Sequence, residues 1–452
     1  MPKKTRYIII TALIIIIITL FFFKRPYDGE ILDFADETIS MYENSELKAF
    51  AYQELAITLF EMDEKEKSHH FAKKASENLY NTGIDHSNSK IAQNLARIFS
   101  KLEDNKNADY YAEKLINMKD NNPAIQYLQT ITAITPYIKE NQLKEKVKTI
   151  AEEYENKIET YQGNEKIDII AELYKINYEL ENTRKTENLR KLFVNELLQI
   201  TEPLLISAKY SEIADFFLHK NNSEEFLKLI IVIPSEEIRI TKLIEGALHF
   251  YNTGQKEEAL KYAELINIEN IMKIRRAGLV TNLLINYSEV AYKLELKETL
   301  DKIEEYYEVF IDEYDTYERV YFEISKLIIL SRNKKYETVE KHTKDMIEII
   351  ENYPDEHMKT NSYVALISAL TRANNPVAAI KLLDKVEINN VIELVELMAV
   401  KLSEIEECTQ ALKLTSKIND PVVRARTLAR IHKNFETFCQ RGLTFTEKNY
   451  LR

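Results

Sequence analysis

Residues 243–266 read LIEGALHFYNTGQKEEALKYAELI, and this pattern decides the fold of the chain. Apolar residues recur at helical spacing up to Phe250, and again after a short break from Ala259 onwards. Gly246 is small enough to let two helices approach closely, while the larger residues fill the groove between them. Gly254 lies in the break, where a tight turn favours glycine. The stretch therefore predicts two antiparallel helices joined by a short turn.

Several other segments repeat this order of small and large residues. One runs from Leu55 through Asp63 to Ala75, and a weaker one covers residues 213–234. The residues at the position of Ala259 are Ser68, Ala108, Phe226, Leu300, Val339, Ala379 and Ala411. From Ala259 onwards they are spaced by 41, 39, 40 and 32 residues, a period typical of repeated helix pairs. No stretch sustains an alternation with period two, so no strands are predicted.

The pattern resembles the tetratricopeptide repeat, whose paired helices show the same small-large-small order. The tryptophan often found near the start of the first helix is absent, and Leu243 takes its place. Three of the four spacings, 39–41 residues, are longer than the ~34 residues of that repeat and near the lower end of the ~40–47 of HEAT-type repeats, which leaves the exact repeat number open. The resemblance implies an all-α, right-handed α-solenoid of antiparallel helix pairs with a long concave groove.

The predicted organisation has five parts. They are a membrane anchor (1–25), tetratricopeptide-like repeats (30–120), irregular helix pairs (121–202), further tetratricopeptide-like repeats (203–440) and a C-terminal tail (441–452). The third part is expected to be irregular because Pro123 and Pro136 interrupt it. The Glu202-Pro203 step is either a boundary or one more turn between helices.

The predicted anchor is the stretch YIIITALIIIIITLFFF from Tyr7 to Phe23, which has 17 residues and no charge. As a helix it would span ~25 Å, and flanking lysines and arginines can reach past its ends to the membrane interface. A cleavable signal peptide needs small residues after the apolar run. Here the run ends in three phenylalanines followed by Lys24 and Arg25, which favours an uncleaved, single-pass signal anchor.

The flanks of the anchor also predict its orientation. Three basic residues precede it, whereas two follow it and lead into an acidic stretch. Positive-inside counting gives N-in and C-out by a narrow margin, which places the body on the periplasmic or extracytoplasmic side of a bacterial inner membrane. Two cysteines, Cys408 and Cys439, could pair in that compartment, although sequence spacing cannot show whether they come close enough.

Composition and motifs exclude several classes of function. The chain has 452 residues, of which 45% are hydrophobic and only 7 are glycine. Phosphate-binding and dinucleotide-binding loops, the H-E-x-x-H pair and the G-x-S-x-G elbow are absent. A net charge of −12 disfavours binding to nucleic acid. We therefore expect no catalytic residues, no cofactor and no metal ligands.

The charge is distributed unevenly along the chain. Residues 421–452 contain seven basic residues against only Glu436 and Glu447. A solvated basic terminal helix is the ordinary interpretation of such a run, and a dedicated site for an acidic partner is the alternative.

The resemblance also indicates where a partner would bind. In repeats of this kind the first helix of each pair lines the concave face. The candidate partner-binding residues on this basis are Gln53, Arg97, Lys101, Tyr251, Asn252, Arg332 and Arg372. The alternative is that these are ordinary groove residues without a dedicated ligand.

The leading hypothesis is a membrane-anchored scaffold that holds a protein or peptide partner in the groove, with an oligomeric state that the sequence leaves unknown. A cytoplasm-facing adaptor or regulator of reversed topology is the second hypothesis. An enzyme with an unrecognised polar pocket in residues 120–200 is the third. Determining the side of the membrane separates the first two.

Overall fold

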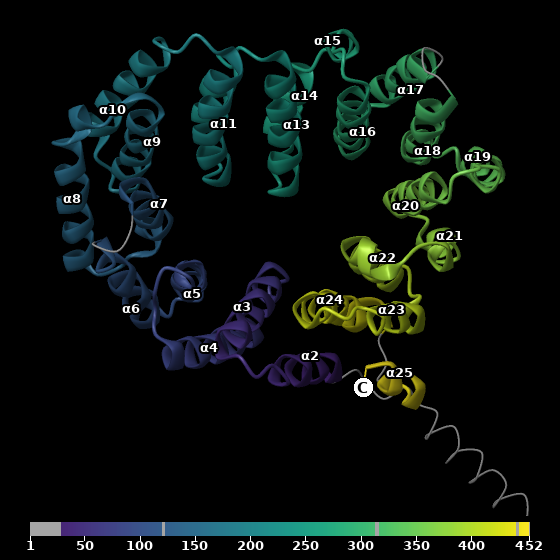
Figure 1. The fold of residues 1–452 in the computed structure, drawn as a ribbon, viewed down its shortest axis with the longest axis horizontal. Helices are drawn as coiled ribbons and strands as arrows, with labels where there is room; N and C mark the ends of the chain where they lie inside the picture. The colour runs from purple at the N-terminus through teal and green to yellow at the C-terminus, as the bar shows by residue number, and fades with distance from the viewer. Residues whose placement is uncertain (1–28, 120–122, 312–315, 440–442, 452) are drawn as a thin grey trace, which may run out of the picture. The chain divides into compact units, whose positions relative to one another are not determined.

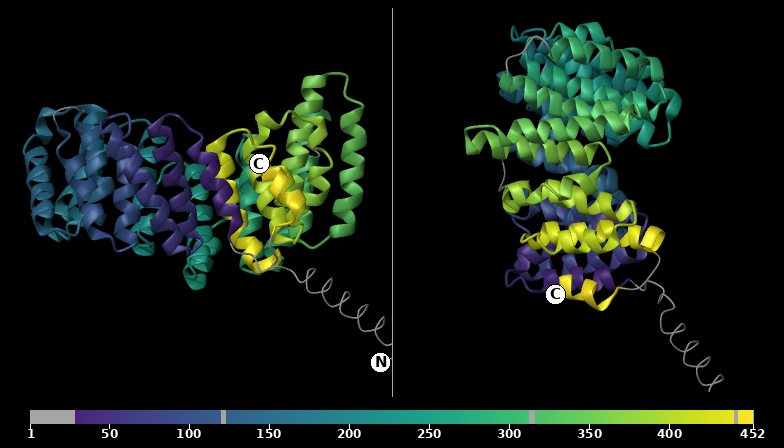
Figure 2. Two further views of the ribbon diagram at one scale, coloured as in Figure 1. Left: turned by 90° about the horizontal axis from the view of Figure 1, so that it is seen from below. Right: turned by 90° about the vertical axis from the view of Figure 1, so that its right-hand side faces the viewer.

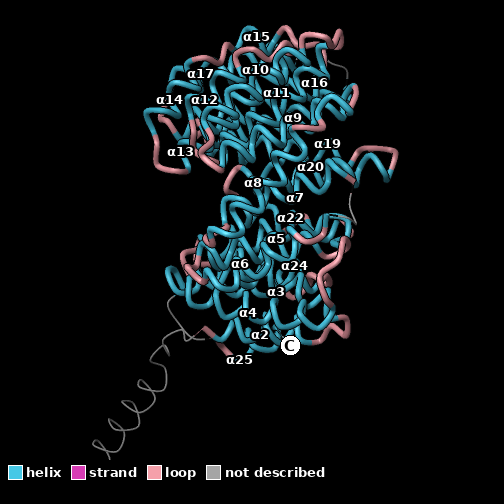
Figure 3. The backbone as a smooth tube through the Cα atoms, turned by 90° about the vertical axis from the view of Figure 1, so that its left-hand side faces the viewer, coloured by secondary structure: helices cyan, strands magenta, loops and turns pink. Residues whose placement is uncertain are grey.

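The computed structural model describes residues 29–119, 123–311, 316–439 and 443–451. These residues form helices joined by short loops, without a strand among them (Figure 3). Contacts divide the chain into two compact units, one of residues 1–83 together with 387–452, and one of residues 84–386. The predicted anchor, residues 7–23, lies outside the described residues. No helix within the described ranges is both long and apolar enough to cross a bilayer.

The second unit, residues 84–386, is a succession of helix pairs (Figure 1). Its elements are α5 (Ser89–Lys101), α6 (Asn105–Ile116), α7 (Ala124–Ile134), η2 (Thr135–Tyr137), α8 (Asn141–Glu155), η3 (Ile158–Thr160), α9 (Gly163–Glu179), α10 (Thr183–Leu197), α11 (Pro203–His219), α12 (Ser223–Ile230), α13 (Glu236–Asn252), α14 (Lys256–Glu264), α15 (Ile268–Met272), α16 (Ala277–Lys293), α17 (Lys297–Ile311), α18 (Thr316–Arg332), α19 (Tyr336–Glu351), α20 (Glu356–Arg372), α21 (Pro376–Ile380) and η4 (Leu383–Lys385).

The first unit combines segments from both ends of the sequence. Its elements are α2 (Glu30–Ser40), α3 (Ser45–Glu61), α4 (Lys65–Thr82), η5 (Ile388–Val391), α22 (Ile392–Glu404), α23 (Cys408–Thr415), α24 (Pro421–Asn434), the π-helical η6 (Phe435–Cys439) and α25 (Phe445–Leu451). Helix α24 packs against both α2 and α3, so N-terminal and C-terminal helices lie side by side (Figure 2).

One turn recurs between the two helices of a pair. A residue with positive φ, between 55° and 80°, ends the first helix at Asp63, Glu103, Glu181, Asn221, Gly254, Glu295, Lys334, Asn374 and Glu406. In each case the next residue donates its N–H to a carbonyl five residues back, at 2.7–3.0 Å, as Gln255 does to Phe250. This Schellman arrangement satisfies the last carbonyl groups of the first helix. Its recurrence confirms the repeated helix pair predicted from residues 243–266.

The turn also fixes the register of the second helix. The residue five positions after each positive-φ residue is the one aligned with Ala259 in the sequence, as Ser68 is with respect to Asp63. All eight aligned residues are buried. Glu181 gives a ninth turn of the same kind, so α9 and α10 form a regular pair inside the segment for which irregular pairs were predicted. Pro203 is the first residue of α11, where a proline suits the start of a helix.

Gly246 shows why small residues are needed where the helices meet. A Cβ atom at this position would lie 2.6 Å from Phe226 Cε1 and 3.1 Å from Tyr262 Cδ1. Both rings are buried, so they cannot move aside cheaply. The glycine lets α13 pack directly against the aromatic residues of α12 and α14.

The basic C-terminal region is largely paired, unlike the solvated helix that its composition suggests. Arg426 makes two hydrogen bonds to the buried Glu396 carboxylate, at 2.9 and 2.6 Å, and Arg430 adds a third at 3.1 Å. Lys433 reaches Glu64 at 3.0 Å. The pairing arises because this region packs against acidic residues of the same unit.

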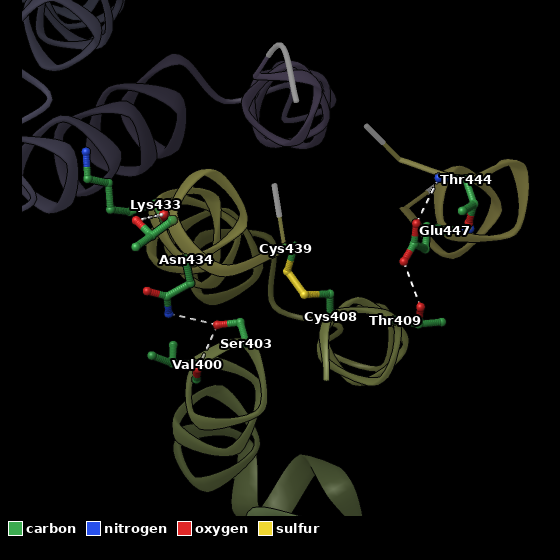
Figure 4. The surroundings of a disulfide bond; sticks show 10 residues. Val400, Ser403, Cys408, Thr409, Lys433, Asn434, Cys439, Thr444 and Glu447 are labelled. Carbon is green, nitrogen blue, oxygen red and sulfur yellow. Dashed lines mark hydrogen bonds between the residues drawn. A yellow bond between two sulfur atoms is a disulfide. The ribbon is translucent and has the colours of Figure 1, made fainter. Parts of the chain in front are cut away.

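Cys408 and Cys439 form a disulfide bond, with their Cα atoms 6.4 Å apart. The bond joins the start of α23 to the end of η6 (Figure 4). Hydrogen bonds flank it, because Asn434 donates to Ser403 Oγ at 2.8 Å and Thr409 donates to Glu447 at 2.7 Å. The disulfide thus settles the pairing that sequence spacing left open.

Candidate partner-binding cavity

A cavity of about 920 Å³ lies in the second unit at the C-terminal ends of α13, α16 and α18. Each of these is the first helix of a pair, so the cavity is built from three successive helix-to-helix turns. Its aromatic members are Tyr251 and Tyr292, and the Tyr292 side chain is 42% exposed. We call this space the basic cavity, for the charges described next.

Cations dominate the lining. The basic cavity contains Lys293, Lys297, Arg332, Lys334 and Lys335, against only Glu295 and Asp301. Lys335 is neutralised by Glu304 at 2.5 Å, outside the lining. Within the described residues, Lys297 and Lys334 have neither an ion pair nor a hydrogen-bond partner for their ammonium groups. A net positive site on a chain of net charge −12 attracts an acidic ligand.

Lys293 connects two of the residues predicted to bind a partner. Its ammonium lies 5.2 Å from the centre of the Tyr251 ring and 3.2 Å from Asn252 Oδ1. A cation over a tyrosine face is attracted by the ring quadrupole. The side chain is thereby held at the cavity, with donor capacity left for a ligand.

Arg332 belongs partly to the cavity and partly to the fold. Only 10% of its side chain is exposed. Its guanidinium donates to the Ile285 carbonyl, to Ser288 Oγ at 2.5 Å and to Glu289 at 3.1 Å, which fastens α18 to α16. Burial lowers the pKa of Arg332 to about 10, against the attraction of Glu289. The residue stays charged at neutral pH.

Arg372 lies close enough to Arg332 for the two charges to repel, which adds to the lowering of the Arg332 pKa. It donates a hydrogen bond to Asn286 Oδ1 at 3.2 Å. No carboxylate pairs with it among the residues that the structure describes. The α16–α20 region therefore extends the positive charge of the basic cavity.

The other predicted residues are not brought to this cavity. Gln53 belongs to the first unit, is fully buried and donates to Glu54 at 2.8 Å. Arg97 is half-buried and Lys101 is exposed, both on α5. Lys293, Lys297 and Lys334 were not predicted, because they lie at helix ends and turns. The predicted residues lie on the helix face that the resemblance assigns to the concave groove. The proximity of the three lysines to the positive-φ residues is the signal that could have found them.

A separate charged cluster lies in the first unit. Ligand atoms of Glu64, His432 and Glu436 lie within 4.8 Å of one another. The Lys67 ammonium lies among them, 2.7 Å from His432 Nε2, 3.0 Å from Glu64 and 3.3 Å from Glu436. A lysine thus supplies the positive charge there, and we interpret the cluster as a contact between α4 and the α24–η6 segment.

The paired helices and their recurring turn define a helical-repeat protein of the tetratricopeptide-like kind. The sequence matches no protein-family model and no curated protein. Among solved structures, it is similar to a Rap protein complexed with competence and sporulation factor, with 12% identity, coverage of 83% of this chain and 98% of that one, and a TM-score of 0.26.

Two further solved structures are similar to the chain. A circular tandem repeat protein with a novel repeat topology and enhanced subunit contact surfaces is 12% identical, with 90% and 98% of the two chains covered and a TM-score of 0.24. Yeast Tom70 is 12% identical, with 85% and 95% covered and a TM-score of 0.25. At this level of identity and superposition, the three carry no argument about what this chain binds.

Proposed function

We propose that the protein is a membrane-anchored helical-repeat scaffold that holds an acidic segment of a partner protein in the basic cavity. The observation that carries this proposal is the lining itself, in which Lys293, Lys297 and Lys334 have no ion pair in the described structure, whereas Arg332 and Lys335 are already paired with Glu289 and Glu304. The ammonium groups of Lys297 and Lys334 have no ion-pair partner among the described residues, so they are available to a ligand. Tyrosine and arginine are the residue types that most often dominate protein–protein interfaces. Binding, rather than catalysis, is what this arrangement favours.

A binding assay tests the proposal directly. The full-length chain in detergent is titrated into a fluorescein-labelled peptide rich in glutamate, with a lysine-rich peptide as the comparison. We expect the acidic peptide to bind, and the double substitution Lys293→Glu and Lys297→Glu to weaken it by at least about tenfold, because attraction becomes repulsion. Lys256→Glu is the matched control, since this exposed lysine lies on α14 outside the cavity. Absence of binding, or an equal loss in the control, overturns the proposal.

We further propose that residues 7–23 anchor the chain in a bacterial inner membrane with the body on the extracytoplasmic side. Two observations support this orientation. The basic residues before the apolar stretch outnumber those after it. The Cys408–Cys439 disulfide suits an oxidising compartment, where such bonds form and persist.

A reporter fusion distinguishes this orientation from that of a cytoplasm-facing adaptor. A phosphatase that folds only outside the cytoplasm, fused after Arg452, is expected to be active in intact cells. Deletion of residues 1–25 is expected to abolish this activity and to release the body from the membrane fraction. A silent phosphatase with an active cytoplasmic reporter at the same position would establish the reversed topology.

A further inference from the structure

A second cavity, of about 820 Å³, lies elsewhere in the second unit, between α9, α10, α11 and α12. Like the basic cavity it is built at helix-to-helix turns, here those of Glu181 and Asn221. Its lining contains four glutamates against Arg190 and Lys228, so its charge is opposite in sign. We call this space the acidic cavity.

The acidic cavity is lined by a tyrosine whose hydroxyl group has no hydrogen-bond partner in the described part of the chain. Tyr174 is only 2% exposed, and its ring packs 5.8 Å from that of Phe217. Yet nothing in the described part of the chain forms a hydrogen bond with its hydroxyl, although buried tyrosines normally find a partner. Tyr262 and Tyr287, which are buried comparably, donate to carbonyl groups at 2.8 and 3.2 Å. The Tyr174 side chain is thus buried while its hydroxyl oxygen reaches the cavity without a partner among the described residues, so a ligand in the cavity can form a hydrogen bond with it.

The carboxylates around this hydroxyl are incompletely neutralised. Glu187 is matched by Arg190, which makes two hydrogen bonds to it at 2.9 Å. Lys228, in contrast, serves two glutamates, Glu224 at 2.7 Å and Glu225 at 2.8 Å.

Glu181 lines the same cavity and has no cation beside it in the described structure. Glu179 is paired with Lys220, which lies outside the lining, so the negative charge that remains in the acidic cavity comes from Glu181 and from the glutamates that share Lys228.

Aromatic surface completes the lining. The Tyr178 ring lies 5.0 Å from that of Phe217, and its hydroxyl accepts a hydrogen bond from Asn222 at 3.1 Å. Half-buried tyrosine rings next to carboxylates attract cations through both charge and the ring quadrupole. Burial raises the pKa of Tyr174, with a further contribution from Glu225, so the hydroxyl stays neutral.

We propose that the acidic cavity binds a primary ammonium group, which donates hydrogen bonds to the Tyr174 hydroxyl oxygen and to the Glu225 carboxylate. The group belongs either to a lysine side chain of a partner or to a small polyamine. This site is distinct from the basic cavity and does not depend on the function proposed for it. If both sites act on one partner, that partner carries acidic and basic segments.

Isothermal titration of the full-length chain tests this proposal with two probes, spermidine and a terminally blocked peptide containing three lysines. We expect at least one of them to bind. Tyr174→Phe removes only the hydroxyl and is expected to weaken binding by about tenfold, and Glu225→Gln by at least as much, since hydrogen bonds to charged groups are the stronger kind. Binding of spermidine alone identifies a polyamine site, and binding of the peptide identifies a lysine site.

Matched controls keep the result interpretable. Tyr287→Phe removes the hydroxyl of another buried tyrosine outside the cavity and is expected to leave affinity unchanged. Lys293→Glu in the basic cavity should also leave it unchanged, which separates this proposal from the preceding one. Thermal unfolding of each variant confirms that it folds. Failure of both probes to bind, or an unchanged affinity in Tyr174→Phe, overturns the proposal.

Discussion

Lys67 Nζ lies 2.7 Å from His432 Nε2, although 365 residues separate the two in the sequence. Lys67 belongs to α4 and His432 to α24, so the contact fastens N-terminal to C-terminal helices within the first unit. The His432 side chain is fully buried. An imidazole that faces an ammonium group at this distance must be neutral, because its nitrogen accepts the hydrogen bond.

Acidification should therefore destabilise the first unit. Burial and the Lys67 charge lower the pKa of His432 to about 4 from a usual 6.5. Between these values the unfolded chain binds a proton here and the folded chain does not, so the free energy of unfolding falls as the pH drops. The expected loss from pH 7 to pH 5 is up to about 2 kcal/mol, measured by urea unfolding.

His432→Gln is expected to flatten this dependence while lowering stability at pH 7. The titration of the nearby Glu64 does not mask this effect. Burial raises the pKa of Glu64, but hydrogen bonds from Lys433 and Lys67 lower it further, so the pKa lies below its usual range. The stability that ionised Glu64 contributes is therefore lost only at a lower pH than that of His432. An equal slope in the variant and the unmodified chain would contradict the assignment to His432.

Reduction of the Cys408–Cys439 disulfide should also weaken the first unit. The bond closes a loop with a sequence separation of 31 residues. The loss of loop-closure entropy in the unfolded chain predicts a stabilisation of about 3–4 kcal/mol. Unfolding in urea with and without dithiothreitol measures the difference. The double substitution Cys408→Ser and Cys439→Ser should match the reduced protein, and an unchanged midpoint in both would show that the bond contributes nothing.

The recurring turn predicts that removing a glycine from one turn destabilises the chain and that introducing a glycine into another stabilises it. Gly254 has φ of +80°, so Gly254→Ala should destabilise the chain by about 1 kcal/mol. Exposed Glu103 holds φ of 64° at the same place in another turn, and Glu103→Gly should stabilise the chain by up to about 1 kcal/mol. Thermal melting compares the two. Shifts of the same sign would mean that the left-handed conformation is not what limits these turns.

Two helical glycines form a further matched pair. Gly246→Ala places a methyl group against Phe226 and Tyr262 and should cost about 1–3 kcal/mol through overpacking. Gly278 in α16 has nothing within 4 Å of an added Cβ, so Gly278→Ala should stabilise the helix by up to about 1 kcal/mol. Denaturant midpoints of both variants measure the contrast. Similar midpoints would contradict the close approach at Gly246.

The register of the repeats was predictable from sequence because it depends on residues that lie close together along the chain. Ala259 and its equivalents are small or apolar at fixed distances from a turn, and each is buried where the alignment placed it. Thr186 stands at that position after Glu181 but is only half-buried, so it follows the pattern less clearly than the eight aligned residues. The α9–α10 pair was assigned to an irregular segment.

The cavities were less predictable because they depend on which helix ends lie together. Tyr251 and Arg332 were selected from one helix face, and both line the basic cavity. Gln53 was selected on the same reasoning but is enclosed by packing in its unit. The sequence alone does not show that the Tyr174 hydroxyl lacks a partner within the described ranges, because other buried tyrosines, Tyr262 and Tyr287, donate to carbonyl groups.

The composition of the first unit sets an order for its assembly. Helices α2 and α3 are synthesised early, yet α24, which covers them, follows only after the more than 300 residues of the second unit. During translation α3 can pack against α4, but the sides of α2 and α3 that face α24 stay uncovered until α24 is made. A chain truncated before α24 would expose the apolar surfaces of α2 and α3 that α24 covers, so the first unit is complete only when synthesis of the polypeptide is complete.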